Sequence, residues 1–294
     1  MEPDSQHKKT ILVTGANGQL GREFQQLQKS YSSYNFIFLT KEQFSITDEN
    51  AVNVFFKNKL IHFCINCAAY TTVDKAETEQ DSAMAVNASA VGILARACKN
   101  HNAKFIHIST DYVFDGKGKI PYTEKDDTNP VNYYGQTKLT GEQNALVENN
   151  ETIIIRTAWV YSSFGNNFVK TMIRLMKERA SLGVVSDQYG CPTYAADLAN
   201  AIMQIIASNN FIAGIYHYSN KGKISWYDFA KEISLQINSD CIVNGISTKE
   251  FPTPAARPYY SVLDTTKITD TFQIIIPEWK DSLKKCLSVL KSQK

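Results

Sequence analysis

A tyrosine and a lysine four residues apart, Tyr134 and Lys138, form the pair with the clearest chemical potential in the chain. This spacing places a phenol and an ammonium one turn apart on the same face of a helix. A free tyrosine has a pKa of about 10, and lowering it by about 3 units requires roughly 4 kcal/mol. A cation held nearby in a partly dry cleft can supply that stabilisation. The pair therefore predicts a proton donor that works near neutral pH.

The same spacing recurs at Tyr227 and Lys231, so the pattern alone carries little weight, and a solvated helix pair is the simpler interpretation there. Only Tyr134 follows both a glycine-rich turn and a strand that ends in a hydroxyl residue, Thr110. A hydroxyl at that place can donate a hydrogen bond to a developing oxyanion. The alternative for Thr110 is a threonine that caps a turn at the end of its strand.

The glycine-rich turn spans residues 14–21 (TGANGQLG), directly after a short apolar run. Gly15 permits a tight turn, Gly18 lets the backbone approach a pyrophosphate, and Gly21 allows a helix to pack closely on the strand. The helix N-terminus offers unpaired N–H groups to phosphates. The spacing is one residue longer than the Gly-x-Gly-x-x-Gly form, and its context predicts dinucleotide binding.

The end of the second expected strand bears on the choice of cofactor. An acidic residue there would bind the ribose 2′-hydroxyl of NAD, but this chain has Thr40 and Lys41. A hydroxyl and a cation suit a 2′-phosphate, which favours NADPH. Because Glu42 follows directly, NADH remains possible, and Lys41 could instead be a solvated surface lysine.

The elements that must position these residues alternate between short apolar runs and helical patterns in the first half of the chain. Strands are expected at residues 10–14, 35–40, 62–67, 104–109 and 152–157. Helices are expected at residues 18–29, from a cap at Asp48 to 58, at 80–101, and around Tyr134. Repeated β-α-β units predict an α/β protein with a Rossmann-like, doubly wound parallel sheet. The long loop at residues 111–132 leaves the carboxyl end of a strand, where such sheets bind ligands.

The second half is expected to form a smaller lobe. Residues 1–160 are interpreted as the dinucleotide-binding domain and residues 161–294 as mainly a substrate-binding lobe, with elements from about 182 to 218 returning to the first domain. The expected elements are helices at 166–180, 195–208, 225–237 (capped by Ser225) and 280–291, and a strand at 182–186.

Composition is that of a globular protein: of 294 residues, 43% are hydrophobic and 20% are charged, with a net charge of +2. The charge does not suggest a nucleic-acid or membrane partner, and no apolar run reaches the ~18 residues of a membrane span. Residues 1–9 are polar and do not resemble a signal peptide, so a cytoplasmic location is expected. Cys64 and Cys67 fall on opposite faces of an expected strand and are interpreted as buried thiols, not a redox pair. The histidines lack metal-ligand spacing, and no metal site is predicted.

Further runs make the chain resemble the dTDP-4-dehydrorhamnose reductase family of the extended short-chain dehydrogenase/reductases. Those runs lie at residues 66–77 (NCAAYTTVDKAE), 109–116 (STDYVFDG), 156–161 (RTAWVY), 166–168 (NNF), 187–193 (DQYGCPT) and 257–258 with Ser261. They follow one another in order over nearly the whole chain, so the joint match is specific although any single run is weak. The resemblance implies NAD(P)H-dependent reduction of the 4-keto group of dTDP-4-dehydro-L-rhamnose to dTDP-L-rhamnose.

The resemblance also implies roles for residues. Tyr134 would donate the proton, and Lys138 would keep the pKa of its phenol in the working range and reach the nicotinamide ribose. Together with the glycine turn and the end of the second strand, the resemblance gives as cofactor-binding residues Gly15, Asn17, Gly18, Gln19, Leu20, Gly21, Thr40, Lys41, Ala68, Ala69, Tyr70, Thr71, Tyr134 and Lys138. Thr40 and Lys41 depart from the family pattern, in which an acidic residue often ends this strand. The substrate-binding residues would be Thr110, Asp111, Tyr112, Trp159, Asn167 and Arg257.

Two of those substrate residues have alternatives of their own. Trp159 could belong to a core, although its place just past a strand end favours a cleft. Arg257 could bind the diphosphate through its guanidinium fork or form a surface ion pair. Some family members bind magnesium through glutamates at a dimer contact. Glu23 matches one such position, but the others cannot be placed, so a homodimer is possible and no metal is predicted.

Two rival functions remain open on the sequence. One is a nucleotide-sugar epimerase or dehydratase of the same superfamily, which would retain NAD without net consumption of NADPH. The other is a non-catalytic NADP-binding subunit resembling the regulatory subunit of methionine adenosyltransferase. The combination of Thr110, Tyr134 and Lys138 favours the reductase.

Overall fold

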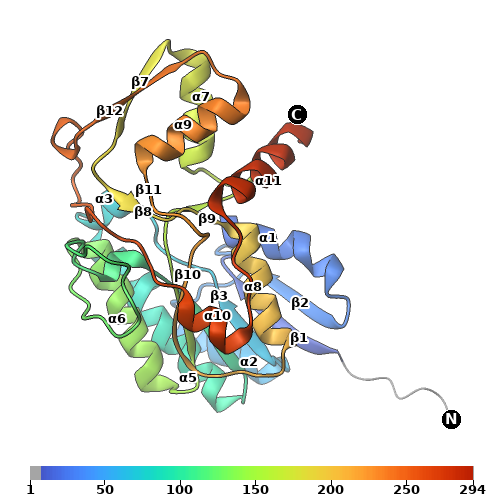
Figure 1. Cartoon of the computed structure of the whole chain (residues 1–294). Helices are drawn as coiled ribbons and strands as arrows, with labels where there is room; N and C mark the ends of the chain where they lie inside the picture. Colours follow the sequence, from blue (N-terminus) through green and yellow to red (C-terminus); the bar gives the residue numbers. More distant parts are fainter. Residues whose placement is uncertain (1–7, 294) are drawn as a thin grey trace.

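The computed structural model describes residues 8–293, so most of the polar segment expected at residues 1–9 lies outside the described part. A six-stranded parallel sheet forms the centre, in the order β10-β5-β4-β3-β1-β2 (Figure 1). Its strands are β1 (Lys9–Thr14), β2 (Tyr34–Leu39), β3 (Phe63–Asn66), β4 (Lys104–Thr110), β5 (Ile153–Thr157) and β10 (Gly214–Tyr218). The predicted Rossmann-like, doubly wound sheet is confirmed.

Helices cover both faces of this sheet. They are α1 (Gln19–Leu27), α2 (Glu49–Asn58), α5 (Ala90–Asn100), α6 (Tyr133–Glu148), α8 (Ala195–Ala207) and α10 (Thr266–Phe272). On β1, Ile11 and Val13 pack in one core with α8, whereas Leu12 packs in a second core with α2 and α5. The side chains alternate because successive residues of a strand point to opposite faces. Burial on both sides explains the uninterrupted apolar runs at residues 11–13 of β1 and 153–155 of β5.

The carboxyl end of the sheet carries a smaller group of elements, seen in the upper part of Figure 1. It contains α7 (Phe168–Glu178), α9 (Trp226–Ile237), α11 (Trp279–Ser292), β7 (Ser181–Val185) and β12 (Ile242–Ile246). A third core, which includes Phe229 and Leu283, holds these helices together. Short two-residue pairings connect the segments nearby: β6 (Val160–Tyr161) with β9 (Thr193–Tyr194), and β8 (Tyr189–Gly190) with β11 (Ile224–Ser225).

The helix expected at residues 80–101 is confirmed as a continuous helical segment from Gln80 to Asn100. It contains a π-helical turn at Ala85–Ser89, between α4 (Gln80–Met84) and α5, which the sequence did not predict. The strands β10 and β12 and the helix α10 were not predicted either. A short helix, α3 (Val73–Ala76), precedes α4, and a 3-10 turn, η3 (Asp111–Val113), opens the long loop after β4. The predicted caps Asp48 and Ser225 are confirmed, since each side chain accepts a backbone N–H of the helix that follows.

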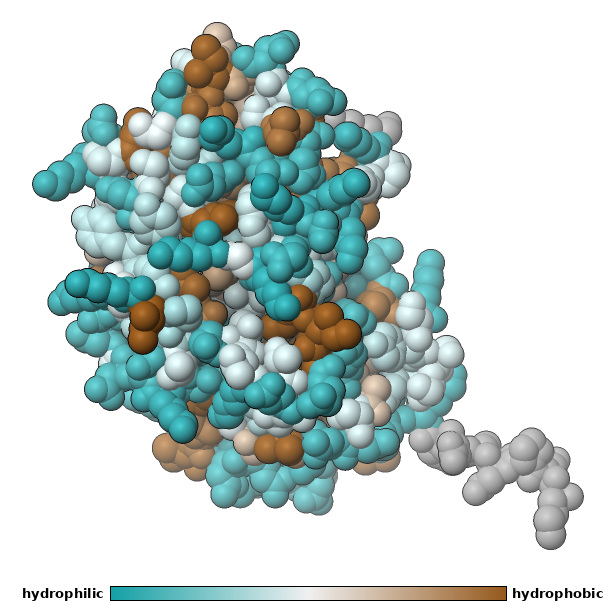
Figure 2. Space-filling view, viewed as in Figure 1, coloured by the Kyte–Doolittle hydropathy of each residue, from teal (hydrophilic) through white to brown (hydrophobic). Residues whose placement is uncertain are grey.

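The molecular surface in Figure 2 is mostly hydrophilic, with hydrophobic side chains in small separate groups. Within residues 8–293, no helix has the length and apolar character needed to cross a bilayer. All six cysteines carry free thiols, and burial raises the pKa of Cys67 well above its ordinary value. This fits the interpretation of Cys64 and Cys67 as packing residues.

Candidate active site

The glycine turn lies where the strand order of the sheet reverses, between β1 and β3. Open α/β sheets bind ligands at this point. Gly15 adopts a left-handed φ of 64°, and a Cβ atom there would lie 2.6 Å from the backbone nitrogen of Ala68. A Cβ on Gly21 would lie 2.5 Å from the Gly15 carbonyl oxygen. The sequence thus needs glycine at both positions to bring α1 and the loop after β3 against the turn.

The N-terminus of α1 is open to an anion. Gly18 is its N-cap residue and no side chain caps the helix. The first N–H groups of a helix lack intrahelical partners and attract phosphate. This end has the chemistry that a pyrophosphate requires, and the predicted residues Asn17, Gly18, Gln19 and Leu20 lie at it. Their contact with a cofactor stays a prediction.

Asn167 lies at this turn, where it supports Gln19. Its Nδ2 donates to Gln19 Oε1 at 2.9 Å and to the Ser162 carbonyl at 2.8 Å, while its Oδ1 caps α7 by accepting the Lys170 N–H at 3.1 Å. The amide is thus occupied by protein partners. This arrangement supports positioning of the cofactor side of the site, and direct contact of Asn167 with the sugar stays a prediction.

Thr40 and Lys41 follow β2 directly and lie beside the glycine turn, because Ala16 N donates to the Leu39 carbonyl at 3.1 Å. Lys41 is exposed. Glu42 is also exposed, and its pKa is lowered chiefly by a hydrogen bond from the Thr40 side chain. The position is suited to the adenosine ribose, and the structure leaves the Lys41 ammonium available to a 2′-phosphate.

The predicted cofactor segment 68–71 is held by a residue that the sequence did not reveal, Asn87. Asn87 Oδ1 accepts the Tyr70 N–H at 2.8 Å, and its Nδ2 donates to the Tyr70 carbonyl and to Thr137 Oγ1, both at 3.0 Å. Thr137 lies on α6, next to Lys138. Asn87 therefore ties the loop after β3 to the helix that carries the predicted proton donor.

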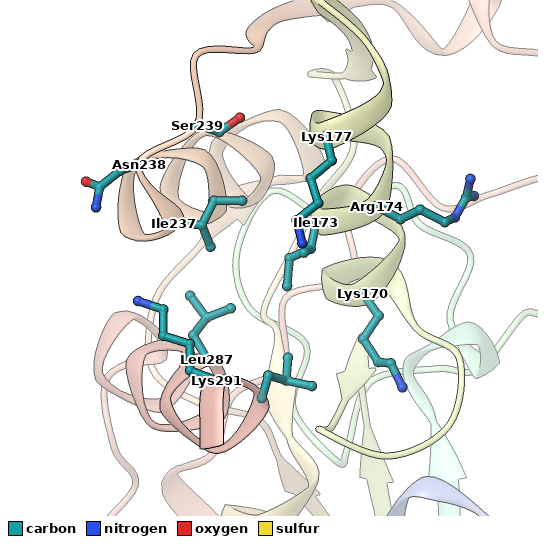
Figure 3. Close-up of a pocket in the computed structure, with 10 residues that line it drawn as sticks. Lys170, Ile173, Arg174, Lys177, Ile237, Asn238, Ser239, Leu287 and Lys291 are labelled. Atoms are coloured by element: carbon teal, nitrogen blue, oxygen red, sulfur yellow. The ribbon is translucent and has the colours of Figure 1, made fainter. Parts of the chain in front are cut away.

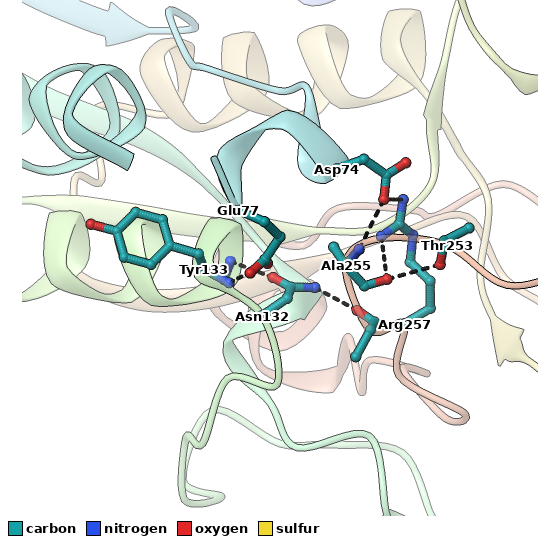
Figure 4. A network of polar contacts seen from close by, with 9 residues as sticks. Asp74, Glu77, Asn132, Tyr133, Thr253, Ala255 and Arg257 are labelled. Carbon is teal, nitrogen blue, oxygen red and sulfur yellow. Dashed lines mark hydrogen bonds and ion pairs between the residues drawn. The ribbon is translucent and has the colours of Figure 1, made fainter. Parts of the chain in front are cut away.

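The first turn of α6 is fixed by polar contacts from three separate segments (Figure 4). Asn132 caps the helix by accepting the Gly135 N–H at 2.8 Å, and its Nδ2 donates to the Ala256 carbonyl at 2.8 Å. Glu77 Oε1 accepts the Tyr133 N–H at 2.9 Å. These contacts set the direction in which Tyr134 leaves the helix.

Tyr134 is partly buried beside Tyr112, whose ring meets it edge-on at 5.7 Å between centroids. Burial raises the pKa of Tyr134 to about 12, and an interaction with the Thr110 side chain only partly opposes this. The expected lowering of this pKa by Lys138 is therefore wrong for the protein alone. A raised pKa keeps the phenol protonated at neutral pH, which is the state that a proton donor needs.

Lys138 explains that error, because its ammonium group is bound elsewhere. The side chain is 1% exposed, Nζ donates to the Ile108 carbonyl at 2.7 Å, and Nζ lies 3.3 Å from His107 Nε2. Burial lowers the pKa of Lys138 to about 8, partly opposed by the Glu142 carboxylate. The lysine is thus anchored under the site by β4.

A buried ion pair lies one helical turn beyond Lys138. Arg156 Nη2 donates to Glu142 Oε2 at 2.7 Å, and both side chains are at most 3% exposed. Ser109 also donates to Glu142. Removing one partner of such a pair would leave an uncompensated buried charge, so this contact fixes α6 against β4 and β5.

Thr110 and Asp111 end β4 beside Tyr134. Thr110 Oγ1 accepts the Tyr112 N–H at 3.3 Å and donates to Asp111 Oδ1 at 3.0 Å, so Thr110 does cap the turn. Asp111 is 2% exposed, and its Oδ2 has no hydrogen-bond partner. Burial raises the pKa of Asp111 to about 6, and the nearby Ser261 hydroxyl, which makes no well-formed hydrogen bond to Oδ2, and the Thr110 hydroxyl oppose this shift. An orphaned oxygen at the end of a parallel strand is suited to a hydroxyl of a bound ligand.

Trp159 is half-buried, between the third core and a small core around Phe114. Its ring stacks on Trp226 with 3.5 Å between centroids, and its backbone is left-handed at a φ of 47°. A Cβ on Gly190 would lie 2.6 Å from the Trp159 indole. A bulky residue holds such a backbone only where its surroundings enforce it. The enforced backbone supports a role for Trp159 as a positioned binding residue. Its ring packs on two cores and is also partly exposed, so both interpretations, core residue and cleft residue, are partly correct.

Arg257 forms an ion pair with Asp74, as the second of its two interpretations from the sequence expected. Its Nη2 donates to Asp74 Oδ1 at 2.9 Å and its Nη1 to the Ala255 carbonyl at 2.9 Å, with the side chain 19% exposed (Figure 4). The guanidinium is therefore fixed close to the first turn of α6. Binding of a diphosphate by Arg257 stays a prediction.

A groove of about 590 Å³ lies elsewhere, between α7, α9 and α11 (Figure 3). Its lining combines apolar side chains such as Ile173 and Leu287 with the cations Lys170, Arg174, Lys177 and Lys291. None of the residues predicted to bind the cofactor or the substrate lines this groove. The second Tyr-x-x-x-Lys pair is also separate from the site, on α9, where Lys231 Nζ lies 5.4 Å from the Tyr227 ring centroid.

Comparison with known proteins agrees with this geometry. The family model described as "RmlD substrate binding domain" matches residues 9–292. A dTDP-4-dehydrorhamnose reductase of Aggregatibacter actinomycetemcomitans is 42% identical, over 93% of this chain and 97% of that protein. The spore coat polysaccharide biosynthesis protein SpsK of Bacillus subtilis is 39% identical, over 94% of this chain and 96% of that protein.

Solved structures of similar proteins also include dTDP-4-dehydrorhamnose reductases. A dTDP-4-dehydrorhamnose reductase of Clostridium acetobutylicum has a TM-score of 0.92 and 46% identity, covering 96% of this chain and 99% of its own. The Bacillus anthracis reductase, solved in complex with NADP, has a TM-score of 0.92 and 40% identity, covering 96% and 100%. With a matching fold, an open phosphate turn and a buried Tyr134–Lys138 helix, the chain belongs to the dTDP-4-dehydrorhamnose reductase family.

Proposed function

We propose that this protein reduces the 4-keto group of dTDP-4-dehydro-L-rhamnose to give dTDP-L-rhamnose, with NADPH as the preferred reductant and NADH as a possible one. The observation that carries the proposal is the position of Tyr134. It lies on α6, beside Thr110 and Asp111, at the carboxyl end of the sheet that also holds the glycine turn. The full-length likeness to proteins named dTDP-4-dehydrorhamnose reductase supports the same substrate.

The bound nicotinamide would supply a hydride to the ketone carbon. The chain's own residues do the rest. Tyr134, protonated at neutral pH, donates its proton to the ketone oxygen as charge develops there. Lys138, whose ammonium donates to the Ile108 carbonyl, acts on the phenolate that remains through its positive charge one helical turn away. Thr110, whose hydroxyl donates to Asp111 in the free protein, would turn that hydroxyl toward the oxyanion.

The remaining site residues hold the two ligands. The N-terminus of α1 and the Ala68–Thr71 loop hold the pyrophosphate and the middle of the cofactor, and Lys41 favours the 2′-phosphate. The NADP bound to the Bacillus anthracis reductase supports this choice of cofactor. Asp111, Trp159 and Arg257 are assigned to the nucleotide sugar. The two-domain division, a homodimer and a cytoplasmic location stay predictions.

The test is the loss of reduced-nicotinamide absorbance when the purified protein receives the keto-sugar with NADPH or NADH. Stoichiometric oxidation is expected, faster with NADPH. Tyr134→Phe should lower kcat about 10²–10⁴-fold while leaving NADPH affinity unchanged, because the phenol acts only on the reacting oxygen. A wild-type protein that binds NADPH but oxidises none of it would favour the regulatory-subunit alternative. Product formation with no net oxidation would favour an epimerase.

A further inference from the structure

Three polar residues occupy one row on the face of the sheet that α6 covers, beside the buried Ser109–Glu142–Arg156 group on the same face. Thr14, Asn66 and His107 pair with one another directly across β1, β3 and β4. The residues two positions earlier on these strands, Leu12, Cys64 and Phe105, all belong to the core on this face. The polar row is at most 1% exposed and ends at Lys138. Burial of four polar groups is costly unless each is hydrogen-bonded.

The hydrogen bonds of this row run in one direction. Thr14 Oγ1 donates to Asn66 Oδ1 at 2.7 Å, and the Ala68 backbone N–H donates to the same oxygen at 3.2 Å. Asn66 Nδ2 then faces His107 Nδ1 at 3.1 Å. Because a backbone N–H can only donate, the contact with Ala68 fixes the orientation of the Asn66 amide. His107 Nδ1 must therefore accept, and a neutral His107 carries its proton on Nε2.

That proton points at Lys138. His107 Nε2 lies 3.3 Å from Lys138 Nζ, and the same Nζ donates to the Ile108 carbonyl. An ammonium has three donors and no acceptor, so it cannot accept from Nε2–H, whereas a neutral amine can. The row of residues therefore favours the uncharged lysine.

We propose that His107 is a positioning residue for Lys138: Asn66 fixes its tautomer, and its Nε2–H sets the pH above which Lys138 loses its charge. This rests on the proposed function only in so far as the charged lysine assists Tyr134. The lowered pKa of Lys138, about 8, agrees with this arrangement, and Lys138 in turn contributes to the strongly lowered pKa of His107 after burial. The titratable groups that act on Lys138 are His107 on β4, at 3.3 Å, and Glu142 on α6, which is itself paired with Arg156 on β5. Tyr134 lies one helical turn before Lys138 on α6, and Asp111 on η3 acts on Tyr134.

The first test measures the tautomer in the protein without ligands. In protein labelled with ¹⁵N-histidine, NMR correlation of ring nitrogens with ring protons distinguishes the two neutral forms, and His107→Gln identifies the signal. The Nε2–H form is expected for His107 at neutral pH. The Nδ1–H form or a charged imidazolium would overturn the proposal. This measurement does not require reductase activity, so it stands even if the proposed function fails.

The second test uses the pH profile of kcat/KM for the reduction. In His107→Gln the side-chain carbonyl can accept from the ammonium, so the alkaline limb should move to higher pH by about one unit. Ser282→Ala is the control. It also removes a buried polar group, a hydroxyl on α11 that contacts Asp197 and Asn220, but this group has no contact with Lys138 or His107. The control substitution should lower stability and leave the limb in place. An unshifted limb in His107→Gln contradicts the proposal, and if that variant does not fold, the wild-type tautomer decides.

Discussion

At the scale of single residues, the site combines two acids whose neutral forms burial favours, Tyr134 and Asp111, with a lysine, Lys138, that loses its charge at a lower pH than usual. Burial raises the pKa values of Tyr134 and Asp111 and lowers that of Lys138. All three shifts favour the uncharged form, as expected when charged groups leave water. Strongly shifted groups gathered at one strand end are typical of functional sites.

Asp111 provides a prediction about stability. Its folded pKa is about 6, above the ordinary value for aspartate of about 4. Its favourable contribution is therefore full below pH ~4 and is lost as the pH rises through ~6. Relative to wild type, Asp111→Asn should gain up to roughly 3 kcal/mol in free energy of unfolding between these limits. Urea denaturation at several pH values measures this.

Asp115→Asn is the control for that series. Backbone and side-chain hydrogen bonds, chiefly from the Lys117 N–H, lower the pKa of Asp115. The trend must then have the opposite sign: the stabilisation by Asp115 is lost as the pH falls. Parallel pH dependences in the two variants would show that burial does not control Asp111.

At the scale of elements, two glycines let α6 reach its neighbours. A Cβ on Gly135 would lie 2.2 Å from the Tyr112 carbonyl oxygen, and one on Gly141 would lie 2.0 Å from the Asn87 carbonyl oxygen. Asn87 belongs to the π-helical turn that interrupts the expected helix. Such turns often occur at functional sites, and here the turn brings Asn87 to both Tyr70 and Thr137.

Gly141→Ala should therefore destabilise the protein, although alanine is the better helix former. The added methyl group would push α6 from Asn87, and overpacking of this kind costs about 1–3 kcal/mol. Gly92→Ala on α5 is the matched control, since its Cβ would meet the Asn144 side chain at 3.3 Å and no backbone atom. Urea denaturation measures the free energy of unfolding of both variants. Equal values would contradict the proposal that Gly141 is needed for the close contact between α6 and Asn87.

The sequence was sufficient for elements with local signals. The glycine turn, the caps at Asp48 and Ser225 and the alternating runs all predicted what the structure contains. It was insufficient where distant segments decide the outcome. The π-helical turn packs against Gly141, and the row from Thr14 to His107 depends on strand register, neither of which is visible in a local pattern.

The same limit applied to the site. Tyr134, Lys138 and Thr110 were found by spacing and context. Asn66, Asn87 and His107 were missed because polar residues in expected strands and helices resemble ordinary surface positions. The direction of the Tyr134 pKa shift was wrong because spacing alone does not reveal that Ile108 and His107 bind the lysine.

At the scale of the whole molecule, the chain leaves the central sheet after β5 and returns to complete it. β10 pairs with β5 at the sheet edge, and α8 supplies Leu198, Ile202 and Ile205 to one of the two main cores. The sheet is thus incomplete without residues beyond 190. Of the residues from about 182 to 218 that were predicted to return, α8 and β10 join the sheet and its core, whereas β7 pairs with β12 in the smaller group. The two-domain division itself stays a prediction.

A fragment of residues 8–180 should therefore fail to fold. Loss of α8 would expose one apolar face of the sheet, including Ile11, Ile65 and Ile155. Far-UV circular dichroism and size-exclusion chromatography should show a disordered or aggregated chain, whereas a fragment of residues 8–218 should retain more secondary structure. A monomeric, cooperatively unfolding 8–180 fragment would disprove this dependence.

The parallel indoles of Trp159 and Trp226 have an optical consequence. Two chromophores in such close contact couple their excited states and should give a paired positive and negative circular dichroism band, absent in Trp226→Leu. A nucleotide sugar resting on Trp159 would perturb this band without any reaction. Titration of the unreactive Tyr134→Phe variant with the keto-sugar would then report substrate occupancy directly, and an unchanged band at saturation would place the sugar away from the indole pair.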